Sequence, residues 1–398
     1  MRKTEIPSIR FRGFDDAWEQ RKLGDIIIEY KETVDSDCTL PILTSSKTEG
    51  VILQEEHFGR KQQHDITGYN ILPRNYCTYR NRSDGVDFTF NINKCCDKGI
   101  ISKFYPVFSS KNCDVFFLSL VLNNSDEVVR EIAYTCTGTG QKVLSFWNLQ
   151  KMKVRAPSFD EQKEIAAYFE DLDHLITLHQ SKYEKLQAIK ASMLEKMFPK
   201  DGAVVPEVRF KGFTGAWKRK RFSELYESVI QKNDLTYGVD KNITVASMQY
   251  RPDIKITDIE YLRTYNVLKL GDIAFEGHQS KEFRYGRFVE NDIGDGIVSH
   301  IFAVFRPKTD YDLMFWKYAI NNERIMRPVL VRCTKASTMM NDLVSKDFLE
   351  ESILVPDIEE QKKIGIVLSE IDRLISLQQE ELKKLQSFKK ALLEKMFV

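Results

Sequence analysis

The stretch that decides the fold runs from Pro157 to Phe198 and reads PSFDEQKEIAAYFEDLDHLITLHQSKYEKLQAIKASMLEKMF. It returns from Pro356 to Phe397 as PDIEEQKKIGIVLSEIDRLISLQQEELKKLQSFKKALLEKMF. The two copies align without a gap at an offset of 199 residues, and 19 of their 42 positions are identical. Such self-similarity indicates an internal duplication, which has to be recognised before the rest of the fold is predicted.

Each copy has the pattern of a long amphipathic helix, because apolar residues recur at steps of four and three. Ser158 stands three residues before Glu161, and Asp357 three before Glu360, which is the spacing of a capping box. Polar residues, His179 in one copy and its counterpart in the other, fall near the helix midpoints. An antiparallel pair centred there would bring the two together, so we expect an antiparallel coiled coil within the chain.

The composition is that of an ordinary globular protein. The chain has 398 residues, with 42% hydrophobic and 29% charged residues and a formal net charge of +1. This length predicts two or three domains, and the neutral balance means that any nucleic-acid surface must be local. No apolar run is long enough to cross a membrane, and the first residues lack the apolar core of a signal peptide. The seven cysteines show no CxxC spacing, which predicts reduced thiols in a cytoplasmic protein and no zinc site.

The duplication also includes a short tag ahead of each helix. Residues 6–18 read IPSIRFRGFDDAW and residues 205–217 read VPEVRFKGFTGAW, again 199 residues apart. Aromatic residues dominate the energetics of buried cores. We therefore expect each tag to pack against the globular segment that follows it.

Between tag and helix, residues 19–156 and 218–355 match poorly and share only islands. The islands at 69–72 and 265–268, and at 99–102 and 296–299, are β-branched and aromatic runs typical of strands. The segments 114–132 and 311–330 have a helical pattern. The expected fold class is therefore α+β, with two globular domains at 1–156 and 200–355. Conserved helices at 157–199 and 356–398 follow them, in an internal pseudo-twofold repeat.

Catalytic motifs are not visible in the sequence. The PDIEEQK run at 356–362 places its acids too close together for a PD…ExK nuclease motif, and it reads better as a helix start. The TGTGQK run at 137–142 lacks the GxxxxGK[ST] pattern of a phosphate loop. The six histidines form no ligand cluster, so we expect neither a metal site nor catalysis in this chain.

Polar and basic clusters in the globular segments are the candidate DNA-binding residues. Arg, Lys, Asn, Gln and Ser are the residue types that contact base edges and phosphates, although solvated loops have the same composition. In the first segment the candidates are Ser45, Ser46, Lys47, Arg80, Asn81, Arg82, Gln141 and Lys142. In the second they are Ser247, Gln249, Arg251, His278, Gln279, Lys281, Arg284, Lys335 and Ser337.

Two divergent segments, each followed by a near-identical helix, resemble the specificity (S) subunit of type I restriction–modification systems. The resemblance rests on the P-x-[IV]-R-F-[RK]-G-F-x-x-A-W tags, the P-x-x-x-EQKxI helix starts and the LEKMF helix ends, and it covers the whole chain. It implies two target-recognition domains, each reading one half of a bipartite site in double-stranded DNA. It also implies that the helices set the spacing and bind two methyltransferase subunits. Those partners would carry S-adenosylmethionine, and restriction subunits would carry ATP and Mg²⁺.

Each helix has more apolar residues than a two-stranded coil needs. The surplus row, which we call the flanking row, consists of Tyr168, Leu175, Ile189, Val367, Leu374 and Phe388. We expect it to bind the methyltransferase subunits, although packing on the chain's own domains is the alternative. A coiled-coil adaptor without DNA binding and a self-contained restriction–methylation enzyme also remain open. The sequence does not indicate the recognised bases, the spacer length, the methylated base or whether restriction occurs.

Overall fold

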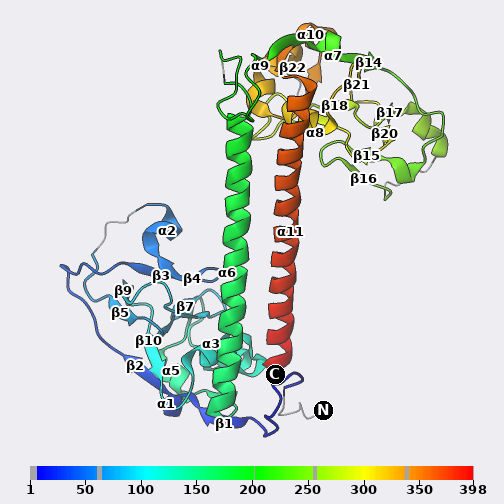
Figure 1. Cartoon of the computed structure of the whole chain (residues 1–398). Coiled ribbons are helices and arrows are strands. Elements are labelled where there is room, and N and C mark those ends of the chain that lie inside the picture. Colours follow the sequence, from blue (N-terminus) through cyan, green and yellow to red (C-terminus); the bar gives the residue numbers. More distant parts are fainter. Residues whose placement is uncertain (1–6, 61–64, 201, 254–257, 337–339, 398) are drawn as a thin grey trace. The chain divides into compact units, whose positions relative to one another are not determined.

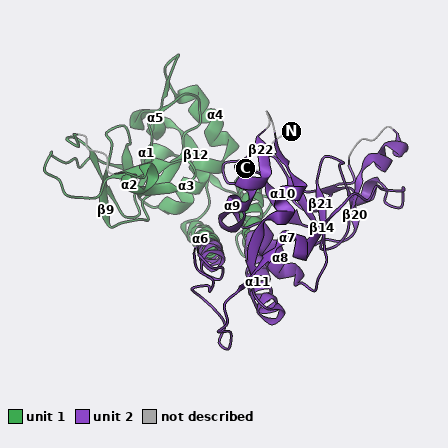
Figure 2. Cartoon of the chain, turned by 90° about the horizontal axis from the view of Figure 1, so that it is seen from above, with its two compact units in different colours: residues 1–180, 381–398 green, residues 181–380 purple. Residues whose placement is uncertain are grey.

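The computed structural model describes the chain except residues 1–6, 61–64, 201, 254–257, 337–339 and 398. It divides into two compact units, which Figure 2 colours separately: residues 1–180 with 381–398, and residues 181–380. Each unit holds one globular domain and a part of both long helices. The division falls within these helices, so the domain boundaries expected from the sequence, which give each helix a segment of its own, remain a prediction.

The two repeated stretches are long helices, α6 (Phe159–Lys196) and α11 (Ile358–Met396), as Figure 1 shows. The Ser158 hydroxyl accepts the N–H of Glu161 at 3.4 Å, and the Asp357 carboxylate accepts the N–H of Glu360 at 3.0 Å. This half of the expected capping box is present at both helix starts. The glutamate side chains, however, do not reach back to the cap, because they bind arginines from the tags.

The first domain contains a four-stranded antiparallel sheet in the order β2-β10-β6-β8 and the two-stranded pairs β1–β12, β3–β4, β5–β9 and β7–β11. Its strands are β1 Glu19–Lys22, β2 Ile27–Tyr30, β3 Leu43–Ser46, β4 Gly50–Leu53, β5 Asn70–Pro73, β6 Cys77–Tyr79, β7 Arg82–Ser83, β8 Phe90–Ile92, β9 Lys98–Ile101, β10 Val107–Ser110, β11 Lys142–Val143 and β12 Lys153–Ala156. Its helices are α1 Leu23–Ile26, α2 Gln54–Phe58, α3 Val115–Asn124, α4 Asp126–Thr135 and α5 Phe146–Lys151.

The second domain repeats this plan, with a four-stranded sheet in the order β14-β21-β18-β19 and the pairs β13–β24, β15–β16, β17–β20 and β22–β23. Its strands are β13 Lys218–Arg221, β14 Tyr226–Val229, β15 Ile243–Thr244, β16 Gln249–Tyr250, β17 Asn266–Leu268, β18 Ile273–Glu276, β19 Arg287–Glu290, β20 Gly296–Val298, β21 Val304–Pro307, β22 Thr334–Ala336, β23 Asn341–Leu343 and β24 Ser352–Val355. Its helices are α7 Phe222–Leu225, η1 Val239–Lys241, η2 Ile259–Thr264, α8 Leu313–Ile320, α9 Glu323–Cys333 and α10 Ser345–Glu350.

The helical region of each domain differs from the sequence expectation of one helix, because it is broken into two. In the first domain Ser125, in extended conformation, ends α3 and begins α4. In the second, Asn321 ends α8 and the Asn322 side chain caps α9 by accepting the N–H of Arg324. Asn favours the cap position because its side chain can accept a backbone N–H of the first helical turn, as Asn322 does here. The apolar pattern runs through the break and therefore hides it.

Each unit closes its core with the end of a long helix. Phe397, after α11, is buried in the first unit beside Trp18 and Phe117. Phe198, after α6, occupies the same place in the second unit beside Trp217 and Phe315. The expectation that the tags pack into the globular domains is met by both tryptophans.

The two long helices run antiparallel in each unit. In the first, Lys389 of α11 pairs with Asp173 of α6, and in the second, Lys190 of α6 pairs with Asp372 of α11 at 2.6 Å. These ion pairs are related by the 199-residue offset, since each residue of one pair has its counterpart in the other. The fold class expected from the sequence is confirmed: α+β domains, two long antiparallel helices and an internal repeat.

Candidate nucleic-acid interface

Five of the candidate DNA-binding residues of the first domain line one pocket of about 320 Å³. They come from three separate stretches of the chain and are Ser45, Lys47, Arg80, Arg82 and Gln141. The remaining lining residues are Ser83, Asp84, Gly85, Asp87, Phe88, Thr89 and Tyr105. The structure therefore brings together residues that the sequence places as much as 96 positions apart, from 45 to 141.

Strand pairing positions these side chains. β7 pairs with β11, so that Arg82 lies opposite Val143, and this pairing brings the segment with Gln141 to the segment with Arg80. The hairpin β3–β4 is fixed from β8, where the Asn91 amide donates to the Ser45 hydroxyl at 2.9 Å and to the Ser46 carbonyl at 2.8 Å. The pocket is thus lined mainly by turn and loop residues, and these strand pairings hold the segments that carry them.

Acidic residues neutralise part of the positive charge in the pocket. Lys47 forms an ion pair with Asp87, and the Gln141 amide donates to Asp84 at 3.5 Å. Arg82 lies over the ring of Phe104, 4.6 Å from its centroid. An arginine that lies against an aromatic ring can still donate from the edge of its guanidinium, and such an edge can contact guanine or phosphate.

Arg80 faces the phenol of Tyr105 across the pocket. Burial raises the pKa of Tyr105, and the charge of Arg80 acts in the opposite direction. The Arg80 side chain is exposed, and its charge acts on the Tyr105 phenol, which lines the same pocket. Tyr105 was not a sequence candidate, because a single aromatic residue in a strand-rich segment gives no signal of its own.

The other candidates of the first domain do not line the pocket. Ser46 shares its hydroxyl with Thr48 at 3.2 Å, and Lys142 is half-buried in β11. Asn81 donates its backbone N–H to the Phe104 carbonyl, while its side-chain oxygen is buried without a protein partner. These three residues are neighbours of lining residues in the sequence and do not line the pocket themselves.

In the second domain, four candidates gather around the hairpin β22–β23. His278 bridges to Met340, and the Gln279 amide donates to Asn341 at 3.3 Å. The Asn341 amide in turn donates to the Arg284 carbonyl at 3.0 Å, and Lys335 lies on β22 opposite Asp342. Lys281 is exposed in the adjoining loop, and Ser337 lies outside the described residues.

Three further candidates of the second domain belong to the hairpin β15–β16. Gln249 pairs with Thr244, Arg251 follows the hairpin and binds Asp253 at 3.3 Å, and Ser247 is exposed in the turn. Arg287 of β19, which was not a candidate, donates to the Ala246 carbonyl at 2.7 Å and ties this hairpin to the main sheet.

The candidate clusters occupy equivalent places in the two domains. The hairpin β3–β4 of the first domain corresponds to β15–β16 of the second, and the segment after β6 corresponds to the segment after β18. The pair β7–β11 corresponds to the contacts that residues 278–284 make with β22–β23. Two domains with different sequences therefore present their polar side chains from the same three positions of one scaffold. Variable side chains on a constant scaffold are the arrangement expected of a module that changes its specificity.

The flanking row on the long helices is largely exposed. Tyr168, Leu175, Ile189 and Phe388 are each more than a third exposed, and Val367 and Leu374 are intermediate. Tyr168 also contacts the tag, since its ring lies 5.6 Å from that of Phe11. Leu178 and Leu377, which are related by the repeat, are exposed as well and were missed because they lie outside the heptad positions considered.

Among the described residues, no group of three or more His, Cys, Asp or Glu side chains is arranged to hold a metal ion. In the same part of the chain, no helix is long and apolar enough to cross a membrane.

Comparison with known proteins gives one family and several similar structures. The family model described as "Type I restriction modification DNA specificity domain" matches residues 15–188 and again residues 216–387. The crystal structure of a type I restriction-modification system S subunit from M. genitalium is similar over 99% of both chains, with 13% identity and a TM-score of 0.60. The HsdS subunit from Thermoanaerobacter tengcongensis matches over 96% of both chains, with 16% identity and a TM-score of 0.45.

Proposed function

Because the chain belongs to the family of type I restriction modification DNA specificity domains, we propose that each of its two domains reads one half of a bipartite DNA site. One observation carries the proposal: three stretches of the first domain converge on one pocket that exposes Arg80, Arg82 and Gln141, and the second domain has candidates at equivalent positions. Arginine and glutamine are the side chains that bind guanine and adenine edges in the major groove.

The chain itself supplies recognition, and the chemistry belongs to partners. We place S-adenosylmethionine on methyltransferase subunits, and ATP and Mg²⁺ on restriction subunits, so that the assembled complex works on cytoplasmic DNA. The two ion pairs join α6 to α11 at related positions of the two units, which supports the proposal that these helices are the spacer between two recognition domains.

The arginine of the pocket tests the proposal. With the methyltransferase bound, Arg82→Ala should weaken binding to the complex's own site by about 1–3 kcal/mol if the arginine contacts a base. The site is first identified by mapping methylated bases in a host that carries the complex. Arg130→Ala is the matched control, because Arg130 is an exposed arginine of α4 in the same domain and does not line the pocket.

Binding to random DNA separates the possible roles of Arg82. An equal loss on random DNA assigns the residue to phosphate contact, since such contacts carry no sequence information. Unchanged binding to both DNAs removes the pocket from the interface and contradicts the proposal.

The flanking row is the docking surface that we assign to the methyltransferase. An exposed apolar row of this kind on a helix marks a protein interaction site. Leu175→Glu with Leu374→Glu would place charges in that contact, at a severe desolvation cost. The double variant should stay folded and lose co-purification with the methyltransferase.

A matched pair of substitutions controls for added charge. Thr177→Glu with Ser376→Glu puts the same charges on exposed positions of the same helices, two residues further along. This control should still bind the methyltransferase. If the Leu175 and Leu374 double variant still binds two methyltransferase subunits, the flanking row belongs to packing within the chain instead.

A further inference from the structure

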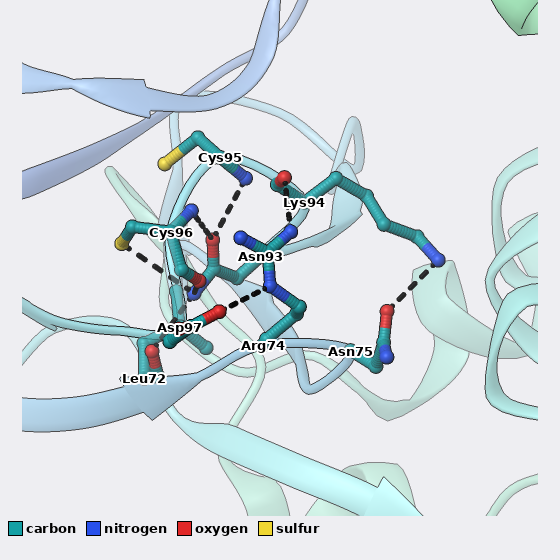
Figure 3. Close-up of polar contacts among 8 residues, drawn as sticks. All are labelled: Leu72, Arg74, Asn75, Asn93, Lys94, Cys95, Cys96 and Asp97. Atoms are coloured by element: carbon teal, nitrogen blue, oxygen red, sulfur yellow. Dashed lines mark hydrogen bonds and ion pairs between the residues drawn. The ribbon is translucent and has the colours of Figure 1, made fainter.

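Two adjacent thiols lie on the turn between β8 and β9 of the first domain (Figure 3). The seven cysteines of the chain are all free, and Cys95 is the exposed one among them. Cys96, the next residue in the chain, is half-buried. The two side chains therefore form a dithiol that reagents in solution can reach.

The turn is held mainly by hydrogen bonds to backbone groups, and the Asn93 amide also contacts the Cys96 sulfur at 3.9 Å. The Asn93 carboxamide oxygen accepts the backbone N–H groups of Cys95 at 3.1 Å and Cys96 at 3.3 Å. Its amide nitrogen donates to the carbonyls of Leu72 and Cys96, both at 3.0 Å. Arg74 donates to the Lys94 carbonyl, and Figure 3 shows these bonds around the buried asparagine.

The second domain builds the same turn without cysteine. Asn291 accepts the N–H of Ile293 and donates to the carbonyls of Leu268 and Gly294, as Asn93 does in the first domain. Ile293 and Gly294 stand where the first domain has its two cysteines. The cysteines are therefore not needed to form the turn.

We propose that Cys95 and Cys96 are a reversible oxidation site that closes to a disulfide by exchange with a low-molecular-weight disulfide. The Cys95 sulfur, after losing its proton, attacks one sulfur of the small disulfide, and the displaced thiolate takes up a proton. The Cys96 sulfur, also after losing its proton, attacks the Cys95 sulfur and displaces the second small thiol. Two protein thiols are oxidised and one small disulfide is reduced to two thiols, so electrons and protons balance.

The geometry makes this bond easy to reverse. Adjacent Cα atoms lie about 3.8 Å apart, whereas the Cα atoms joined by an ordinary disulfide are roughly 4.4–6.8 Å apart. Closure must therefore rearrange the turn, and a strained, exposed disulfide is reduced more readily than a structural one. The pair acts as a switch that opens again when small thiols are in excess.

The rearrangement acts directly on the candidate DNA pocket. Asn93, which binds both cysteine N–H groups, directly follows β8, and Asn91 of β8 holds the hydroxyl of Ser45 in the pocket. If the first domain reads DNA as proposed, formation of the disulfide displaces Ser45 and its side of the pocket and weakens binding to one half-site. The second domain, which has no cysteine in its turn, is unaffected.

The pH dependence of the exchange follows from the environment of the exposed thiol. Partial desolvation, with smaller contributions from Cys96 and from the charge of Glu56 on α2, raises the pKa of Cys95 to about 11. Since the thiolate is the attacking form, the exchange rate should rise about tenfold per pH unit between pH 7 and pH 10.

Mass spectrometry of the full chain tests the oxidation without any DNA. The protein is treated with oxidised glutathione, quenched in acid, alkylated and digested with trypsin, which releases residues 95–98 as one peptide. This peptide should lack two hydrogens and carry no alkyl group, and reduced glutathione should restore alkylation. Cys136→Ser, which removes a distant thiol, should behave as wild type, whereas Cys95→Ser should never form the closed peptide. Alkylation of both thiols, or a glutathione adduct alone, after treatment at pH 9 would overturn the proposal.

DNA binding by the methyltransferase complex tests the consequence separately. On duplex DNA that carries the mapped site, oxidation should weaken binding roughly tenfold, the effect of losing one good base contact. The Cys96→Ser complex should not respond. If the Cys95–Cys96 disulfide forms and DNA binding does not change, the link between the disulfide and the pocket is wrong. If the reduced complex does not bind DNA, the proposed function is contradicted instead.

Discussion

A buried glutamate near the start of each long helix binds an arginine from a tag 151 residues earlier. Arg10 makes two hydrogen bonds of 2.7 Å to Glu161, and Arg209 binds Glu360 in the same bidentate way at 2.6 and 2.8 Å. The sequence identified both partners, but it assigned the glutamates to capping boxes. Local spacing cannot reveal a partner that is distant in the chain, so the role of the shared arginine was missed.

Loss of the arginine should destabilise the chain strongly. Arg209→Ala leaves Glu360, which is 1% exposed, buried without its partner, and breaking such a pair typically costs about 3–5 kcal/mol. Urea unfolding of the purified protein measures the change. Arg219→Ala, at an exposed arginine of β13, should change the free energy of unfolding by less than about 0.5 kcal/mol. A similar loss in both variants would contradict a special role for the buried pair.

Glu290 of β19 is a buried carboxyl without a hydrogen-bond partner on either oxygen. Burial raises its pKa well above 4.5, the neighbouring charges of Asp292 and Asp312 act in the same direction, and Lys317 opposes them. The buried phenol of Tyr226 also faces it and supplies no hydrogen bond. The folded chain therefore keeps this carboxyl protonated at pH values where the unfolded chain releases the proton.

Stability should fall with rising pH because of this residue. Protonated Glu290 makes its full contribution to the free energy of unfolding below about pH 4.5. Above that pH the contribution is lost progressively, because the carboxyl ionises in the unfolded state while it stays protonated in the folded state. Glu290→Gln removes this ionisation at nearly constant size. The variant should gain stability relative to wild type between pH 5 and pH 8, measured by urea unfolding at each pH. The exposed control Glu282→Gln should show no such trend, and a constant difference for Glu290→Gln would contradict the assignment.

At the scale of elements, the sequence predicted strands with a strong β-branched and aromatic pattern. It did not predict the helix breaks or the pairing of two-residue strands. The islands at 69–72 and 99–102 form β5 and β9, which pair with each other, and the second domain repeats this with β17 and β20. The pocket depends on β7 and β11, which have two residues each and no hydrophobic period. The candidate residues could therefore be chosen by type, but their convergence required the tertiary structure.

The end of α11 should matter for the first unit alone. Phe397 is 4% exposed and lies 6.0–6.2 Å, between ring centroids, from Trp18, Phe117 and Phe169. Phe397→Ala should cost about 3–5 kcal/mol through the lost contacts and the cavity. Hydrogen exchange followed by mass spectrometry should show lost protection in residues 7–180 and unchanged protection in residues 181–380. Phe388→Ala, at a position 48% exposed, is the control on the same helix.

At the scale of the whole molecule, the repeat separates what varies from what is kept. The tags, helix starts and helix ends match at the 199-residue offset, while residues 19–156 and 218–355 differ between the domains. The contacts that join tag, helix start and helix end lie in the matching parts. One variable segment can therefore be replaced by another while the tags and the long helices stay the same.

Replacement of residues 19–156 by the corresponding segment of a relative should change one half-site only. The two domains use separate cores, so exchange of the first leaves the core of the second intact. Genome-wide mapping of methylated bases in a host with the hybrid complex gives the new site. A change in both half-sites would contradict independent reading, and loss of all methylation with a folded hybrid would show that the helices do not tolerate the exchange.

The placement of Phe397 in the core of the first unit has a consequence for synthesis on the ribosome. Domains generally fold as units in the order in which they are made. Here the first unit needs residues 381–397, whereas the second unit consists of residues 181–380 and is complete earlier. We therefore expect the second unit to become protease-resistant first on stalled nascent chains, and the first unit to remain open until the last helix has left the exit tunnel. A domain that is begun first but finished last exposes its apolar core residues for longer during synthesis, which is a cost of sharing both helices between the two halves.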